Sequence, residues 1–255
     1  CRSIYTNALE HVDSSVVVSL DLADFFPTFT FKRVKGIFRR AGYFDGIATL
    51  LALLCTEAPR EEVEYDGERY YVALGERCLP QGSPASPALT NAACLRLDRR
   101  LTGFAERYGW RYTRYADDLT FSLPSERPED APDASALISQ LLGAVRAIVE
   151  SEGLTLRPDK THIMRTKTRQ KVTGLIVNGA RDPRTPRELR RRVRAMIHNL
   201  KRGRGLHEGE SVNHLTGLIA FIYMTDPARG AALLRELRQV SPPNVITESS
   251  AGEAH

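Results

Sequence analysis

An acidic pair set between two β-rich segments constrains the fold of this chain more than any other feature. Residues Trp110–Phe121 have the pattern of a strand, a short turn and a second strand, with Asp117 and Asp118 at the turn. Because successive side chains on an extended strand point to opposite faces, both carboxylates can serve one site only where the chain turns tightly. Asp is also common in hairpin turns for structural reasons alone, so the pair by itself leaves both interpretations open.

A third carboxylate ends another predicted strand. Asp21 closes the β-branched run Ser14–Asp21, which has the pattern of a buried strand. Three clustered carboxylates repel one another unless divalent cations neutralise them, and hard oxygen ligands of this kind suit Mg²⁺. Two such ions about 3.5–4 Å apart stabilise the attacking and the leaving oxygen of an in-line phosphoryl displacement. In this interpretation Asp21, Asp117 and Asp118 would bind two Mg²⁺ ions.

The rest of the chain mixes predicted helices with predicted hairpins. Asp66-Gly67, between short β-rich stretches at Glu64–Tyr65 and Arg69–Leu74, is a strong hairpin signal. Strands joined by a charged middle are predicted over Ile163–Asn178. Hydrophobic periodicity and helix-ending residues predict helices over Phe31–Arg40, Gly46–Thr56, Pro84–Tyr108, Ser135–Glu152, Leu215–Tyr223 and Pro227–Leu237.

The C-terminal segment contains the best specified helix. Thr185-Pro186-Arg187-Glu188 has the pattern of a capping box with Pro at the first helical position, and an apolar stripe from Leu189 to Leu200 follows. Residues 179–240 hold 13 Lys and Arg against 6 Asp and Glu, whereas the net charge of the whole chain is +5. Such a segment suits a polyanionic partner and equally suits a solvated helical face.

Composition excludes several classes of protein. With 42% hydrophobic and 26% charged residues, 18 Gly and 14 Pro, the 255 residues match a globular protein and exclude a collagen-like, disordered or disulfide-scaffold chain. The longest apolar runs, such as Ile47–Cys55, are too short to cross a bilayer, so we expect no membrane partner. The four cysteines form no Cys-x-x-Cys pair, which predicts reduced thiols and a cytoplasmic location.

Four segments resemble, in order, the motifs of the reverse transcriptases. They are Val18–Pro27 with the first catalytic Asp, the substrate-contacting segment Leu79–Pro87, the catalytic turn Tyr115–Asp118 and the palm segment Gly153–Thr161. Two further patterns are similar to retron-type enzymes in particular, Asn7-Ala8-Leu9-Glu10-His11 before these motifs and Val172-Thr173-Gly174 after them. Each has a structural explanation when taken alone, as a helix-end histidine and as a strand bend, but both stand where the retron enzymes have them.

The resemblance implies an α+β, right-hand polymerase fold: a palm with an antiparallel sheet, partial fingers and a helical basic thumb. Residues 1–178 would form the reverse transcriptase palm with partial fingers, residues 179–240 an RNA-binding thumb, and residues 241–255 a disordered tail. The chain begins at Cys1 without an initiator Met, and little of the family's fingers segment precedes Asp21. We therefore expect an N-terminally truncated fragment that has weak or no activity alone.

The resemblance also implies roles for the residues at the centre of the site. Asp21 and Asp117 would bind both Mg²⁺ ions, the Leu22 carbonyl would bind the nucleotide-side ion, and Asp118 would be a weaker or alternative ligand. Lys160 would either protonate the pyrophosphate leaving group or bind phosphate.

Other residues would bind the deoxynucleoside triphosphate. The backbone amides of Asp24 and Phe25 would bind its phosphates. The Phe26 ring would exclude ribonucleotides, because it would fill the space of their 2′-OH. Gln81 and Gly82 would contact the incoming nucleotide or the template, since glycine allows close backbone approach.

RNA binding is expected in three places. If residues 165–171 are extended, their alternating cations fall on one face as a rail for phosphates, an inference that fails if the segment turns. The second place is formed by the two retron patterns together, and the third is the first predicted helix of the thumb. The residues are Arg165, Lys167, Arg169 and Lys171; Asn7, His11, Val172, Thr173 and Gly174; and Arg190, Arg191 and Arg194.

As a retron enzyme, the protein would be an RNA-directed DNA polymerase that reverse transcribes a cognate retron non-coding RNA, serving as both template and primer. Synthesis would start from a guanosine 2′-OH and give a branched RNA–DNA product, msDNA, in antiphage defence with a possible effector protein. Two alternatives stay open: a group II intron or other bacterial reverse transcriptase, and a catalytically silent RNA-binding protein with a polymerase-like fold. The three intact acidic positions argue against the silent protein.

Overall fold

Two compact units share the chain. The computed structural model describes residues 3–125, 134–179, 181–207 and 209–240, so the predicted tail 241–255 lies outside the described residues. The central unit is the continuous stretch Ser15–Met164, whereas the terminal unit joins Cys1–Ser14 to Arg165–His255. Each unit has its own hydrophobic core. The terminal unit is therefore assembled from both ends of the chain.

A four-stranded sheet lies at the centre of the central unit. Its strands are β1 (Ser14–Leu22), β4 (Arg111–Tyr115), β5 (Asp118–Pro124) and β6 (Leu156–Arg165). Their order is β4-β5-β1-β6, and β4 pairs with β5 as an antiparallel hairpin. Strand β1, whose β-branched run is mostly buried, is an inner strand of the sheet, as its sequence predicts.

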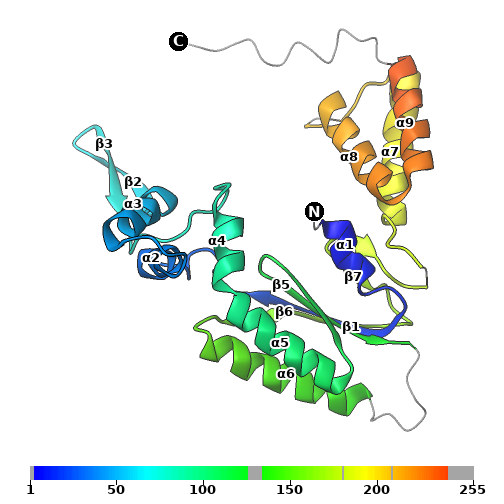
Figure 1. The fold of residues 1–255 in the computed structure, drawn as a ribbon. Coiled ribbons are helices and arrows are strands. Elements are labelled where there is room, and N and C mark those ends of the chain that lie inside the picture. Colours follow the sequence, from blue (N-terminus) through cyan, green and yellow to red (C-terminus); the bar gives the residue numbers. More distant parts are fainter. Residues whose placement is uncertain (1–2, 126–133, 180, 208, 241–255) are drawn as a thin grey trace. The chain divides into compact units, whose positions relative to one another are not determined.

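Two long helices, α5 (Leu95–Tyr108) and α6 (Ala134–Ser151), pack together beside this sheet, as Figure 1 shows. Both helices bury an apolar stripe in the core that β1 and β5 also enter, where Leu101, Leu141 and Phe121 are fully buried. Among the described residues, α6 is the one helix long and apolar enough to cross a membrane by length and composition. Its buried stripe in this core gives that composition a packing explanation.

Smaller elements precede the long helices. Helix α2 (Phe31–Arg40) packs against α3 (Asp45–Cys55). Strands β2 (Arg60–Tyr65) and β3 (Glu68–Ala73) form an antiparallel hairpin in which every residue is exposed. The predicted hairpin turn is confirmed, because the two turn residues, Asp66 and Gly67, both have positive φ.

One predicted helix is in fact two. The periodicity over Pro84–Tyr108 predicted a single helix, but the structure contains α4 (Ser86–Ala93) and α5, separated at Cys94. Cys94 has φ −85° and ψ 3°, outside the helical region, although its N–H still bonds to the Thr90 carbonyl over 2.9 Å. The prediction was wrong because the apolar spacing continues across the break, so periodicity does not detect it.

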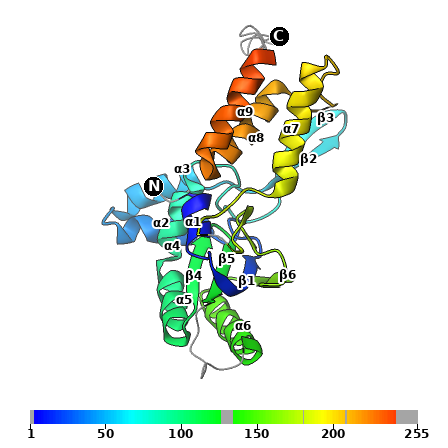
Figure 2. The same ribbon diagram turned by 90° about the vertical axis from the view of Figure 1, so that its right-hand side faces the viewer.

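The terminal unit is mostly helical. It contains α1 (Ile4–Leu9), the short strands β7 (Lys171–Val172) and β8 (Leu175–Ile176), and the helices α7 (Arg187–Lys201), α8 (Val212–Thr225) and α9 (Pro227–Val240). Figure 2 shows the last three helices beside one another, and their apolar side chains form the second core. Val193, Met196 and Ile197 of α7 are buried there, which confirms the predicted apolar stripe.

The capping box predicted at the start of α7 does not form. Pro186 immediately precedes the helix, and no side chain caps it. The Thr185 hydroxyl instead pairs with the Thr225 hydroxyl over 2.5 Å. The Glu188 carboxylate accepts from Arg169 Nη2 over 2.7 Å. Partners distant in sequence thus take both side chains that a capping box uses, and a local pattern does not contain that information.

Candidate active site

The end of β1 and the turn between β4 and β5 lie against each other in the sheet. Strand β5 is next to β1, and the Leu22 N–H donates to the Asp117 carbonyl over 3.0 Å. The pairing of Tyr115 with Asp118 leaves Ala116 and Asp117 as a two-residue turn, in which Ala116 has φ +53°. The turn is therefore as tight as the acidic pair requires for a shared site.

Three carboxylates act on one another at this point. Burial raises the pKa of Asp118, and the negative charges of Asp117 and Asp21 raise it further, while Lys160 partly offsets them. Asp21 is largely buried, with 12% of its side chain exposed. The predicted trio is thus close enough for mutual repulsion. Across the described ranges, no three carboxylate, imidazole or thiolate groups are already arranged as a metal site.

Two cations from β6 lie against Asp21. Lys160 Nζ is 3.4 Å from Asp21 Oδ1, and Arg157 Nε is 3.6 Å from Asp21 Oδ2. Arg157 Nη2 also lies 3.5 Å from Asp24 Oδ1. Sequence reasoning singled out Lys160 and missed Arg157, although both belong to the same palm segment. Strand alternation places residues three apart on opposite faces, so it is the length of these side chains that lets both reach one carboxylate.

A tight loop follows β1. Asp24 has φ +43°, and its carbonyl accepts the Thr28 N–H over 2.9 Å and the Thr28 hydroxyl over 2.7 Å. The Ala23 N–H donates to the Thr155 carbonyl over 2.8 Å, which ties the loop to the segment before β6. Within the described part of the chain, the N–H groups of Asp24 and Phe25 make no hydrogen bond. These two amides are therefore free to bind an anion.

Three aromatic rings anchor this loop in the core. Phe25 is 3% exposed and lies edge to face against Phe29, with 5.2 Å between the ring centroids. Phe26 is only partly buried, and its ring lies 5.4 Å from that of Phe25 in the same edge-to-face manner. The Phe26 ring, which is predicted to exclude ribonucleotides, is thus supported by the buried ring of Phe25.

The segment Leu79–Pro87 passes from the core to the surface. Leu79 is fully buried, whereas Gln81 and Gly82 are exposed in the turn before α4. The Ser86 hydroxyl donates to the Pro80 carbonyl over 2.8 Å and fixes that turn. Gly82 has φ +89°, a conformation that side chains disfavour, so the turn itself requires glycine there.

An ion pair between a buried arginine and a half-buried carboxylate connects the acidic hairpin to α5. Arg114 donates from Nε and Nη2 to the two carboxylate oxygens of Asp98, over 2.8 and 2.7 Å. Tyr112 donates its hydroxyl to the same carboxylate over 2.9 Å. The third contact of Arg114, from Nη1 to the Ala116 carbonyl over 3.2 Å, reaches the turn itself. Sequence reasoning missed this brace, because neither residue belongs to a recognisable pattern.

The two patterns that resemble retron enzymes meet in the terminal unit. The Thr173 hydroxyl, in the turn between β7 and β8, donates to the Ile4 carbonyl of α1 over 3.1 Å. His11 is fully buried and Val172 is 2% exposed, while the Asn7 amide nitrogen is buried without a hydrogen-bond partner. In this structure these residues pack one end of the chain against the other, and their contact with RNA stays a prediction.

The predicted rail of cations is interrupted by a turn. Strand β6 ends at Arg165, and the Thr168 N–H bonds back to the Arg165 carbonyl over 2.8 Å. Because the segment is not one extended strand, the four cations Arg165, Lys167, Arg169 and Lys171 do not alternate along a single face. The condition for a rail, an extended segment, is therefore not met, and contact of these four cations with RNA stays a prediction.

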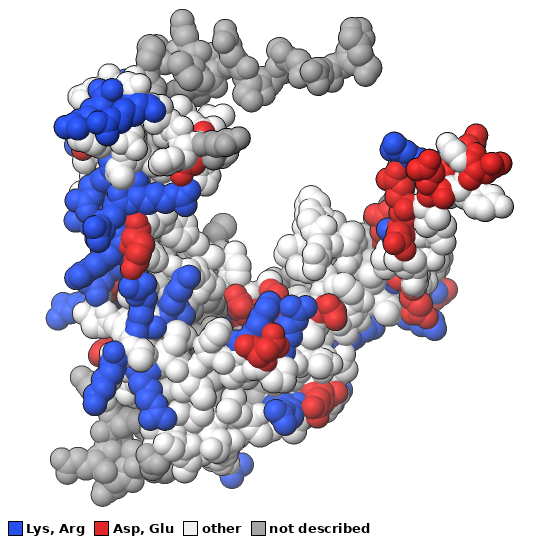
Figure 3. Space-filling model, turned by 180° about the vertical axis from the view of Figure 1, so that it is seen from behind, with Lys and Arg blue, Asp and Glu red and all other residues white. Residues whose placement is uncertain are grey.

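Basic side chains nevertheless gather on the terminal unit. Figure 3 shows Lys and Arg collected over it, in contrast to the acidic β2–β3 hairpin. Of the three predicted RNA-binding residues on α7, Arg191 and Arg194 are exposed and Arg190 is half-buried. The predicted cations of α7 thus lie together on the terminal unit, where Arg190, Arg191 and Arg194 line one pocket.

The residues at the acidic site fit a divalent cation. Asp21, Asp117 and Asp118 offer hard oxygen ligands, and the raised pKa of Asp118 records negative charge that a cation would relieve. The Leu22 carbonyl belongs to the residue whose N–H already bonds to Asp117. The donor set therefore suits Mg²⁺, which the sequence predicted from residue types alone.

Comparison with known proteins gives one consistent result. A family model described as reverse transcriptase (RNA-dependent DNA polymerase) matches residues 2–177. The chain is 50% identical to the retron Mx162 reverse transcriptase of Myxococcus xanthus over 99% of its own length. It is 43% identical to the retron Mx65 reverse transcriptase of the same organism, and 32% identical to the retron Ec86 reverse transcriptase of Escherichia coli.

These alignments cover most of the chain and less of its relatives. The matches to Mx65 and Ec86 extend over 92% and 88% of the chain. They cover 52% of the Mx162 and Mx65 proteins and 60% of the Ec86 protein. The chain spans about half the length of the curated relatives it matches.

Proposed function

The chain belongs to the reverse transcriptase family, and from this premise we propose that it carries the nucleotidyl-transfer site of a retron RNA-directed DNA polymerase. The observation that supports the proposal best is the meeting of β1 with the β4–β5 turn, which brings Asp21, Asp117 and Asp118 under one another's charge. The retron assignment is supported by the names of the similar proteins and by the two retron patterns.

In the proposed reaction, Asp21, Asp117 and the Leu22 carbonyl would hold two Mg²⁺ ions, with Asp118 as a weaker ligand. When bound, these ions would activate the attacking hydroxyl and stabilise charge on the leaving oxygen. The hydroxyl oxygen would bond to the α-phosphorus and lose its proton to solvent, while the bond from the α-phosphorus to the bridging oxygen breaks and pyrophosphate leaves. Lys160 Nζ lies 3.4 Å from Asp21 Oδ1. In the reaction it would bind the departing pyrophosphate instead and donate a proton to it.

The loop after β1 would bind and select the nucleotide. The unpaired amides of Asp24 and Phe25 would donate to the triphosphate, and Arg157, already in contact with Asp24, would add positive charge. Phe26 would exclude a ribose 2′-OH, supported from behind by Phe25. Gln81 and Gly82, on the exposed turn before α4, would contact the template or the incoming base.

The nucleic-acid substrate would be a cognate retron RNA that serves as template and primer. We propose that residues 179–240, with Arg190, Arg191 and Arg194, act as a thumb that holds it, and that residues 1–178 act as palm and partial fingers. Synthesis would start at a guanosine 2′-OH and give branched msDNA in the cytoplasm, in antiphage defence with an effector protein. The two retron patterns and the retron names of the similar proteins support this finer assignment over a group II intron enzyme.

A matched pair of substitutions tests the catalytic assignment. Asp117 and Asp66 each lie in a two-residue hairpin turn, so Asp→Asn changes the same atoms in the same kind of turn, at its second residue for Asp117 and at its first for Asp66. We expect Asp117→Asn to reduce DNA synthesis by at least about a hundredfold and to leave RNA affinity nearly intact, because a hard ligand and a charge are lost. Asp66→Asn should retain full synthesis.

The assay uses the longest natural form of the protein that contains this chain, its neighbouring non-coding RNA, deoxynucleotides and Mg²⁺, without an added primer. A DNA product joined to RNA through a 2′ linkage is the expected result. If DNA is made only when a primer is added in a parallel reaction, the protein is a polymerase but the retron assignment is wrong. Tight RNA binding with no synthesis would instead support the catalytically silent RNA-binding protein.

A further inference from the structure

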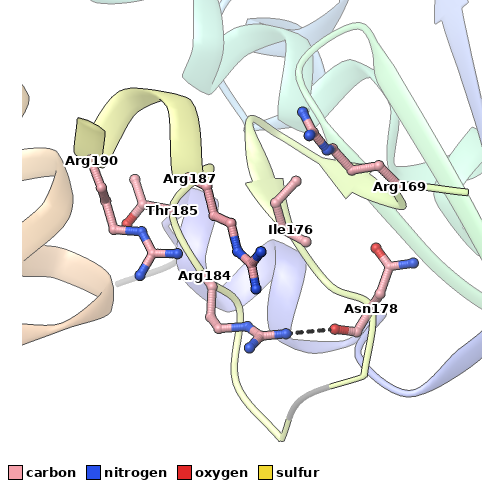
Figure 4. A pocket seen from close by; sticks show the side chains of 7 residues that line it. All are labelled: Arg169, Ile176, Asn178, Arg184, Thr185, Arg187 and Arg190. Carbon is pink, nitrogen blue, oxygen red and sulfur yellow. Dashed lines mark hydrogen bonds between the residues drawn. The ribbon is translucent and has the colours of Figure 1, made fainter. Parts of the chain in front are cut away.

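A pocket lined by four arginines lies in the terminal unit, at the start of α7. Figure 4 shows Arg184, Arg187 and Arg190 along one side and Arg169 on the other. The remaining lining residues are Ile176, Asn178 and Thr185, so no carboxylate lines it. Its volume is 520 Å³, within the roughly 300–1,000 Å³ usual for ligand sites. We call it the arginine pocket.

The charges around the arginine pocket are not balanced. Burial lowers the pKa of Arg190, and three neighbouring cations lower it further, while the Asp226 carboxylate raises it. The three cations are Arg229, Arg187 and Arg184. Arg190 Nε is buried without a hydrogen-bond partner. Within the described ranges, neither Arg187 nor Arg190 forms an ion pair, so their guanidinium groups lack an anion.

The backbone around the pocket is already fixed. Arg184 and Ile176 exchange two backbone hydrogen bonds of 2.9 and 2.8 Å, and Arg184 Nη2 donates to the Asn178 carbonyl over 2.9 Å. Helix α7 starts at Arg187 without a side-chain cap, so its first N–H groups and its positive dipole end face this region. Arg169 is held by an exposed pair with Glu188, which an incoming anion can replace at little cost.

A second pocket of 380 Å³ continues along α7. It shares Arg187 and Arg190 with the arginine pocket and adds three arginines, one carboxylate and two apolar side chains: Arg191, Arg194, Arg229, Glu236, Ala232 and Leu233. From Arg187 to Arg194 the helix rises about 10 Å, which exceeds the size of a single phosphate. Two adjoining cationic pockets along one helix therefore fit successive phosphates of a strand better than they fit one small anion.

We propose that the arginine pocket binds a phosphodiester of the RNA backbone and that the second pocket binds the phosphates that follow it. Arginine is suited to this task because its planar guanidinium donates two parallel hydrogen bonds to phosphate. A phosphate held at a fixed pocket sets the register of the strand without reading its sequence. The inference rests on the proposed function, since the RNA would be the one that the polymerase copies.

Two double variants with the same change of charge test the proposal. Arg187→Gln with Arg190→Gln removes two pocket cations, whereas Arg235→Gln with Arg238→Gln removes two exposed cations of α9 that line neither pocket. The probe is a fluorescein-labelled RNA hairpin, and its affinity is measured by anisotropy over a series of salt concentrations. We expect the pocket variant to lose roughly tenfold or more in affinity and to lower the salt dependence by about two phosphate contacts.

The stability of the variants separates binding from structure. Because the pocket arginines repel one another, the pocket variant should melt at the same temperature as the parent or higher. A structural role predicts a lower melting temperature. If the double variant does not fold, Arg187→Gln alone, at an exposed side chain, carries the same test with about half the change in salt dependence. Equal loss of affinity in the two double variants would overturn the proposal.

Inorganic phosphate distinguishes the two sources of the anion. Suppose that the pocket binds free phosphate and not RNA. At constant ionic strength, phosphate would then raise the melting temperature of the parent but not that of the pocket variant, and the two proteins would bind RNA equally well. That result would overturn the RNA proposal. The anisotropy assay contains no nucleotides and is repeated with Asp117→Asn. That variant should keep the pocket-dependent RNA binding. A parent protein that makes no DNA but still shows pocket-dependent RNA binding would disprove the proposed function and leave the pocket in place.

Discussion

Asp118 is a carboxylate whose charge the folded chain disfavours. Its pKa is raised above 3.8, first by burial and then by Asp117 and Asp21. The protonated form therefore contributes stability that is fully present below about pH 3.8 and is lost as the pH rises through the folded pKa. At pH 7 the charged side chain destabilises the fold by an amount that solvent screening keeps modest.

We expect Asp118→Asn to raise the melting temperature at pH 7 by about 2 °C in buffer with a chelator, and the gain to shrink as the pH falls toward 4. Circular dichroism at several pH values measures this. Asp66→Asn, in an exposed turn, should leave the melting temperature unchanged. Magnesium should then stabilise the parent more than the variant. A lower melting temperature of Asp118→Asn at pH 7 would contradict the account of its charge.

Single residues differ in how far the sequence predicts them. Asp21, Asp117 and Asp118 were predictable because strand alternation and turn chemistry restrict where carboxylates can meet. Arg157 was not, since its contact with Asp21 depends on side-chain length and not on spacing. Buried contacts such as Arg114 with Asp98 leave no local pattern, because the partners come from different elements.

The bidentate ion pair between Arg114 and Asp98 supports the hairpin that carries the acidic turn. Arg114, 5% exposed, binds Asp98 of α5 through two hydrogen bonds and holds the Ala116 carbonyl through a third. We expect Arg114→Lys to lower the free energy of unfolding by about 2 kcal/mol, since an ammonium in this buried position does not reproduce the planar fork and leaves the half-buried Asp98 carboxylate partly unpaired. Urea unfolding measures this loss.

DNA synthesis should also fall in Arg114→Lys, because the turn loses the donor that fixes its carbonyl at the strained residue Ala116. Arg99→Lys is the control with the same chemical change, at an exposed position of α5 next to Asp98, and should change the free energy of unfolding by less than about 0.5 kcal/mol. Equal unfolding curves for the two variants would show that the fork does not stabilise the hairpin.

Helices and turns could be predicted from the sequence where their pattern lies within a few neighbouring residues. Helix α2 was predicted with its observed bounds, and the turn at Asp66-Gly67 follows from its two residues alone. The break at Cys94 and the failed capping box at Thr185 were not predictable. In both places the local pattern is satisfied, and packing or a partner from a distant segment decides the structure.

The terminal unit depends on both ends of the chain, and this gives a prediction for the molecule as a whole. Ala8 of α1 is fully buried, so Ala8→Asp places a charge in the terminal unit at a cost of about 2 kcal/mol or more. We expect hydrogen exchange to accelerate in β7, β8 and α7, near the other end of the sequence. The sheet of the central unit should keep its protection.

Leu9→Asp is the matched control, because Leu9 is 37% exposed and adjoins Ala8 in the sequence. It should leave exchange in the terminal unit close to that of the parent. Uniform acceleration across both units in Ala8→Asp would show that the chain unfolds as one cooperative body. Protection unchanged everywhere would show that α1 is not needed by the C-terminal strands.

The bond between Thr173 and Ile4, 169 residues apart, also sets an order of events during synthesis on the ribosome. Helix α1 is made before the central unit, but its partners β7 and β8 are made only after the whole central unit. At about 5–20 residues per second, α1 waits roughly 10 to 30 s for them. The central unit can fold during that delay, so α1 would join β7 and β8 only after the central unit has formed.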